Sequence, residues 1–142
     1  MAVYSRKCVP FTPFDGELSK STVAIVSAAG VHSKDQEPFN IADELGDLTY
    51  RVIDEQKKST DLMVTHHHYD HADADSDINV VFPLDILEAL KDEGFIGGIA
   101  RKHVGFMGYT MRLKQMYEET APQIAEEIDR GSRADIVLLT GG

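Results

Sequence analysis

The sequence predicts a single α/β domain, 1–142, with a mostly parallel sheet flanked by helices in a Rossmann-like three-layer arrangement that ends on a sheet strand. Two observations support this prediction. Continuous apolar runs, typical of strands buried on both faces of a parallel sheet, occur at 22–28 and 134–140. Further strand candidates alternate with helical patterns between them, as in α/β proteins. The length of 142 residues suits one domain with a sizeable core.

Each element follows from a local pattern. Residues 1–21 are expected to form an irregular N-terminal arm, because Pro10 and Pro13 each remove a backbone donor. The predicted strands are 22–28, 48–53, 61–65 and 134–140, with strand-and-loop pieces at 95–99 and 104–109.

Three helices are predicted from the local sequence signals. Pro83 suits the first turn of a helix over 84–93. A second helix is expected over 111–120, and Thr120 with Gln123 matches a capping box that starts a third. The side chains expected to face the sheet from the last two helices are Leu113, Tyr117, Ile124 and Ile128.

Composition excludes several classes of protein. The net charge is -10 and Lys+Arg total 14, which argues against nucleic-acid binding because phosphate recognition needs a basic face. There is no apolar run of membrane-spanning length and no apolar signal core at the N-terminus, so we expect a cytoplasmic protein without membrane contact. Cys8, the single cysteine, excludes an internal disulfide and is expected to be inert.

The stretch 64–77 is unusual, because it holds four of the six histidines and four carboxylates. Such groups are costly to bury without partners. His32 follows the first predicted strand, the histidine cluster follows the third, and Gly141-Gly142 follows the last. Ligands bind beyond the carboxyl ends of parallel strands, so these three features are expected to meet at one edge of the sheet. His103, beside Arg101 and Lys102, is expected on the surface.

One local pattern favours a metal site. His66, His68, Asp70 and His71 match the H-x-H-x-D-H pattern, which resembles that of metallo-β-lactamase-fold hydrolases, where such residues bind zinc and a metal-bound hydroxide attacks the substrate. That fold needs further ligands downstream, and only His103 remains. A zinc-dependent hydrolase is therefore kept as an alternative, with zinc as its cofactor.

A longer resemblance covers nearly the whole chain. The sequence resembles the selenoprotein B family of glycine, sarcosine, betaine and D-proline reductases, and is most similar to the D-proline reductase branch. The order and spacing of several short blocks together support the resemblance. These blocks are VSAAGVH (26–32), EPF (37–39), THHHYD (65–70), DINVVFPL (77–84), EGFIG (93–97), GFMGY (105–109), ETAP (119–122) and DIVLLTGG (135–142).

The resemblance implies where the nucleophile lies. In that family the last strand leads into a selenocysteine or cysteine, and this sequence stops immediately before that position. We therefore expect the N-terminal part of a longer selenoprotein, ended at a UGA codon read as termination. The 142-residue chain itself lacks the nucleophile, and Cys8 lies in no matching motif. The chain alone is expected to be inactive and to contain no cofactor, with selenocysteine expected in the full-length form.

The resemblance also implies an activity and a site. Family members cleave a C–N bond reductively, with electrons from a dithiol. The implied partners are a carbonyl-containing (pyruvoyl-type) subunit, a thiol redox donor protein and a small amino-acid-like substrate. A homo-oligomer is compatible with this scheme, and an inactive or binding-only paralogue is a further alternative. The expected catalytic residues are His32, His66, His67, His68 and Asp70, which orients an imidazole, and the expected substrate-binding residues are Gly30, Phe106, Met107, Tyr109, Gly141 and Gly142.

Overall fold

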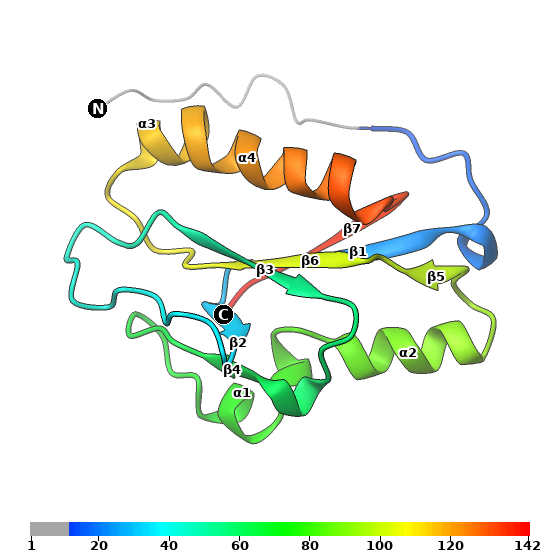
Figure 1. The fold of residues 1–142 in the computed structure, drawn as a ribbon, viewed down its shortest axis with the longest axis horizontal. Coiled ribbons are helices and arrows are strands. Elements are labelled where there is room, and N and C mark those ends of the chain that lie inside the picture. The colour runs from blue at the N-terminus through cyan, green and yellow to red at the C-terminus, as the bar shows by residue number, and fades with distance from the viewer. Residues whose placement is uncertain (1–11) are drawn as a thin grey trace.

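The computed structural model describes residues 12–142, and a five-stranded mixed sheet forms its middle layer (Figure 1). β1 pairs in parallel with β5 and β6 on one side and with β7 on the other. β3 pairs antiparallel with β6 at the far edge. The strands of this sheet are β1 (Thr22–Ser27), β3 (Tyr50–Asp54), β5 (Gly98–Ile99), β6 (Lys102–Phe106) and β7 (Ile136–Thr140).

A second, two-stranded antiparallel sheet lies against the first. It consists of β2 (Val31–Ser33) and β4 (Leu62–Val64). Gly105 in β6 permits this packing, because a Cβ atom at that position would lie 1.8 Å from the carbonyl oxygen of Val31. The predicted α/β class is confirmed. The Rossmann-like parallel layering was too specific, since β3 and the β2–β4 sheet add antiparallel pairings.

Helices cover both faces of the main sheet, as Figure 1 shows. On one face lie α1 (Ala72–Ser76) and α2 (Leu84–Asp92). On the other face lies one long helical stretch over 113–132, here called the long helix. It consists of α3 (Leu113–Gln115), a π-helical segment (Met116–Thr120), α4 (Ala121–Glu126) and a second π-helical segment (Glu127–Ser132). Short 3₁₀ turns occur at Leu18–Lys20, Ser59–Asp61 and Ile78–Val80.

The predicted boundary between two helices at Thr120 was wrong. Thr120 has helical φ and ψ angles of -67° and -47°, and its Oγ1 donates to the carbonyl oxygen of Leu48 at 3.0 Å. The hydroxyl is therefore used in a tertiary contact rather than as a cap. Ile124 and Ile128 are buried as predicted, whereas Leu113 and Tyr117 are exposed.

Two apolar cores result, one on each face of the main sheet. The core on the α2 side contains Ile25, Val31, Ile53, Phe82, Leu84 and Leu87. The core under the long helix contains Ala24, Val26, Ala100, Val104, Ile124 and Ile128. β1 contributes to both, so its continuous apolar sequence is explained by burial on two faces.

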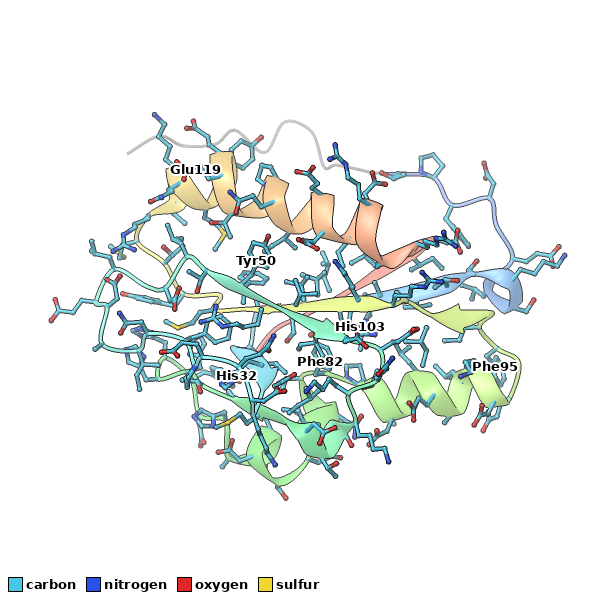
Figure 2. All side chains as sticks on the ribbon, in the orientation of Figure 1. His32, Tyr50, Phe82, Phe95, His103 and Glu119 are labelled. Atoms are coloured by element: carbon cyan, nitrogen blue, oxygen red, sulfur yellow. The ribbon has the colours of Figure 1, made fainter. Side chains whose placement is uncertain are left out.

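His103 was predicted at the surface, and this was wrong because its side chain is fully buried. β1 pairs with β5 at Thr22 and Val23 and with β6 only from Val26 onward. In the interval, the Ile25 N–H donates to His103 Nδ1 at 3.0 Å. The imidazole thus replaces a missing ladder bond, and its ring meets Phe82 edge-on at 5.9 Å (Figure 2).

The end of the chain also departs from expectation. β7 was predicted to be a buried strand, but Val137, Leu138 and Leu139 are exposed. The predictions on Cys8 and on 1–11 of the N-terminal arm lie outside the described residues. Within residues 12–142, no helix is both long and apolar enough to span a membrane.

Candidate functional site

The carboxyl edge of the sheet is held together by Gly30. Its N–H donates to the Phe106 carbonyl and its own carbonyl accepts from the Thr65 N–H, both at 2.9 Å. Gly30 has a φ of +74°, and a Cβ atom there would lie 2.5 Å from the Thr65 carbonyl oxygen. Only glycine allows this approach at this φ. The ends of β1, β6 and β4 therefore meet at one place, and β4 delivers the histidine cluster there.

The end of β7 reaches the same place. The Ala28 N–H donates to the Thr140 carbonyl at 2.9 Å, and Gly142 lies against the Tyr69 ring so closely that a Cβ atom would sit 2.4 Å from Cζ. The Tyr69 hydroxyl donates to the Ala29 carbonyl at 2.9 Å. The predicted meeting of the cluster with Gly142 is thus confirmed, although β4 belongs to the separate antiparallel β2–β4 sheet and His32 lies buried beneath the cluster.

The histidine cluster lies where the strand order of the main sheet reverses. β1 has β6 on one side and β7 on the other, so the strand order reverses at β1. Crevices outside the carboxyl ends of strands at such a reversal are the usual ligand sites of open α/β sheets. The cluster lies at this reversal.

His66 is the most enclosed member of the cluster, with 8% of its surface exposed. Its Nδ1 accepts the His68 N–H at 3.0 Å, and its ring meets the Tyr69 ring edge-on at 4.8 Å. Burial, with added repulsion from His68, His67 and His71, lowers the pKa of His66 to about 4. At neutral pH the imidazole is therefore uncharged, with its proton on Nε2. A protonated His66 that stabilises an anion by its charge does not fit this environment.

His67 and His68 lie on the exposed side of the cluster. The His68 ring stacks on the Tyr109 ring, with 3.4 Å between the ring centroids and 23° between the ring planes. The centroid of the His67 ring lies 3.9 Å from that of the His68 ring. Desolvation and then the proximity of His67 lower the pKa of His68. Tyr109 therefore joins the predicted substrate-binding segment to the cluster.

Asp70 and His71 act differently from the prediction. The Asp70 Oδ1 accepts the Ala72 N–H at 3.1 Å where α1 begins, so within the described residues it orients backbone rather than an imidazole. His71 bonds to the Asp75 carboxylate through Nδ1 at 2.8 Å and to the His66 carbonyl through Nε2 at 3.1 Å. Both residues fix the shape of the loop.

His32 lies beneath the cluster and is fully buried. Its Nδ1 donates to the Ser33 carbonyl at 2.9 Å, and its Nε2 bonds to the Thr65 hydroxyl at 2.8 Å. Its ring meets Phe39 edge-on at 5.8 Å, and Figure 2 shows it in the interior below the main sheet. His32 thus supports the residue that precedes the cluster, and solvent does not reach it.

The predicted metal ligands do not assemble. Among residues 12–142, no group of three or more His, Cys, Asp or Glu side chains is placed to hold a metal ion. The His66 Nδ1 and both ring nitrogens of His71 already have hydrogen-bond partners, and Asp70 accepts from backbone. The zinc hydrolase alternative therefore receives no support.

The predicted substrate-binding residues divide into two groups. Gly30, Tyr109 and Gly142 contact the cluster, and a Cβ atom added to the preceding residue, Gly141, would meet nothing within 4 Å. Met107 is fully buried beside Ala29, and Phe106 packs against the core under the long helix. Tyr69, which contacts Ala29, His66 and Gly142, was not among the predicted site residues. Its place inside the histidine run was the available signal.

Comparisons with known proteins identify a family over nearly the whole chain. Residues 2–141 match the family model described as "Glycine/sarcosine/betaine reductase selenoprotein B (GRDB)". No solved structure matches the chain.

Three curated relatives carry reductase names. The D-proline reductase subunit gamma of Acetoanaerobium sticklandii is 44% identical over 93% of this chain and 53% of its own length. The sarcosine reductase complex component B subunit beta of Peptoclostridium acidaminophilum is 33% identical over 76% of this chain and 25% of its own length. The glycine reductase complex component B subunit gamma of Carboxydothermus hydrogenoformans is 32% identical over 93% of this chain and 30% of its own length. The chain thus spans about half the length of the first relative, and less of the others.

Proposed function

The chain belongs to the glycine/sarcosine/betaine reductase selenoprotein B family, and from this membership we propose that it carries the histidine-lined wall of a reductase active site. The reaction is reductive cleavage of a C–N bond in a substrate of the D-proline, glycine, sarcosine or betaine class. The observation that supports this most is the contact of Gly142 with Tyr69, whose ring adjoins His66.

The nucleophile is proposed to be a selenocysteine or cysteine that follows Gly142 in a longer protein. The family description names a selenoprotein, and the relatives are matched over only 53%, 25% and 30% of their lengths. Such a group supplies attack on the carbon beside the nitrogen, with the amine as leaving group and a dithiol as the source of two electrons. A selenol is ionised at neutral pH, as an activated nucleophile must be.

The residues of this chain have separate tasks in the proposal. His66 is neutral at pH 7, so its Nε2–H donates a hydrogen bond to a substrate carboxylate or to an anionic nucleophile without adding charge. His67 and His68 are exposed, so their ring nitrogens are accessible for proton transfer to the departing amine. The Tyr69 ring contacts His66 and the Tyr109 ring stacks on His68, and these contacts hold the two imidazoles in place.

The partners follow from the same membership. Two of the relatives are named as subunits of a component B of a reductase complex. We therefore propose that the protein works with a carbonyl-containing, pyruvoyl-type subunit that holds the amine substrate and with a thiol redox protein that returns the electrons. This assembly is proposed to lie in the cytoplasm.

Two experiments test the proposal. The nucleotide sequence after the Gly142 codon should show UGA followed by an open frame, and a different stop codon would contradict the proposed selenoprotein.

The selenium-containing long form should then be assayed with its partner subunits for dithiol-dependent cleavage of D-proline, glycine, sarcosine and betaine. One substrate should be cleaved only when the dithiol is present. Failure with all four substrates, in a complex shown to be assembled, would overturn the proposed activity.

A further inference from the structure

β7 has the sequence of an interior strand but the environment of an edge. It pairs with β1 along Ile136–Thr140, and no other described strand pairs with its outer side. Val137, Leu138 and Leu139 are 42%, 37% and 74% exposed. Strands that are apolar on both faces normally lie inside a sheet, and an exposed apolar edge invites association. β7 is therefore expected to have a neighbour.

An apolar groove lies beside this edge. It has a volume of about 480 Å³ and runs between the long helix and the sheet. Its walls include Met116, Ala121, Ile124 and Ile128 from the long helix and Val137 and Leu139 from β7. The long helix covers the face of the sheet opposite α2 (Figure 1), and the groove, which the long helix lines, lies on that face.

The connections already present indicate what fits there. After β1 the chain forms β2, β3 and β4 and then passes through α2 to β5 and β6 on one side of β1. From β6 it passes through the long helix to β7 on the other side of β1. Crossovers between parallel strands are nearly always right-handed. A further crossover that continues outward from β7 is right-handed only if its helix lies on the same face as the long helix. That face contains the groove.

We propose that one helix–strand unit of the same polypeptide covers the groove and the outer edge of β7. This unit belongs to the further chain that a protein as long as its relatives would have. The helix fills the groove beside the long helix, and the strand pairs in parallel with β7. The D-proline reductase subunit gamma is matched over 53% of its length, so relatives have ample further chain to provide such a unit. The proposal shares with the proposed function only the assumption of a longer protein.

This occupant explains both features together. A second copy that paired its β7 with this β7 would cover the strand edge without supplying a helix to the groove. A separate partner subunit would leave both surfaces apolar until assembly. The covalently continuous unit also makes β7 a central strand, which is what its sequence predicts.

Site-resolved thiol labelling tests the proposal. Leu139→Cys places a thiol on the proposed interface, and Ile86→Cys is the matched control, since Ile86 is an exposed aliphatic residue of α2 on the opposite face. Each variant is made in the 142-residue chain and in the long form, and labelling is followed peptide by peptide by mass spectrometry. We expect the Leu139→Cys thiol to react at least roughly tenfold more slowly in the long form. The Ile86→Cys thiol should react equally in both.

Every other outcome overturns the proposal. Equal labelling of Leu139→Cys in both forms leaves the surface open. Protection of the 142-residue chain that grows with its concentration identifies a second copy, and protection that needs added partner subunits identifies another polypeptide. A reading frame that ends at Gly142 removes the proposed occupant. Because reductase activity is not measured, a failed activity assay does not affect this result.

Discussion

Two groups of histidines in this protein have the same chemistry and different settings. His32 and His103 are fully buried within the cores, and each accepts or donates hydrogen bonds that hold strands in place. His66, His67 and His68 lie at the carboxyl edge of the sheet, where aromatic rings rather than strands surround them. The role of each imidazole therefore follows from its neighbours. The first group supports the fold, and the second lies at the edge where the substrate is proposed to bind.

The largest expected difference between the two groups is in stability. His103→Ala should lower the free energy of unfolding by about 2–4 kcal/mol, because it leaves the buried Ile25 N–H without an acceptor and opens a cavity. His67→Ala, in the exposed group, should change it by less than about 0.5 kcal/mol. Urea unfolding of both variants gives the two values. Similar values for the two variants would mean that the distinction between the groups is wrong.

Acid should weaken the fold through His103. The pKa of His103 is lowered to about 4 by burial, against the raising effect of Asp54, and the ordinary value in the unfolded chain is about 6.5. The unfolded state thus binds the proton first. The stability contribution is complete above about pH 6.5 and is lost as the pH falls toward about 4, by on the order of 3 kcal/mol.

Unfolding by urea at about pH 7, 6 and 5 checks this, since most carboxylates stay ionised over that range. The lowered pKa of His66 also makes the free energy of unfolding fall with falling pH. A His66→Gln variant should therefore keep only the part of this pH dependence that comes from His103. A stability that is constant from pH 7 to pH 5 would show that His103 has the same pKa in both states.

A smaller effect is expected at Tyr69, which links the strand ends to the exposed group. Tyr69→Phe removes the hydrogen bond to the Ala29 carbonyl and keeps the ring against His66 and Gly142. We expect a loss of about 0.5–1.5 kcal/mol. Thermal unfolding of Tyr69→Phe beside Tyr69→Ala measures it, and Tyr69→Ala should lose more because the ring contacts go as well. Equal losses would assign the whole effect to the hydroxyl.

Metal removal is expected to have no effect at all. Because the ring nitrogens of His71 and the Nδ1 of His66 have partners within residues 12–142, a chelator should leave the unfolding midpoint unchanged. Metal analysis and thermal unfolding with and without the chelator check this. Stoichiometric zinc that disappears in a His71→Ala variant would restore the hydrolase alternative.

The sequence predicted those elements whose reasons are local. β1 and α2 follow from a two-faced apolar run and from a proline start, and both formed where expected. Thr120 has the local features of a cap, but its hydroxyl is used by Leu48, 72 residues away. β2 has three residues and depends on the missing side chain of Gly105, which no local pattern reveals.

The site was predicted to a similar extent. The meeting of the cluster with Gly142 followed from strand order. The roles of individual histidines depended on distant partners, such as Thr65 for His32 and Ile25 for His103, and sequence spacing does not report such contacts. Tyr69 was missed for the same reason, because its contacts to Ala29 and Gly142 exist only after the sheet edge has formed.

The most direct test of the central claim is a rate measurement on the long, selenium-containing form in its complex. Dithiol-dependent substrate cleavage should fall by about 10²-fold in His66→Ala, on the scale of a lost active-site donor. His66→Gln should recover most of the rate, because its amide both accepts the His68 N–H and donates a hydrogen bond, as the neutral imidazole does. A His66→Ala variant that is folded and cleaves substrate at the wild-type rate would contradict the assignment of this edge as the reductase site.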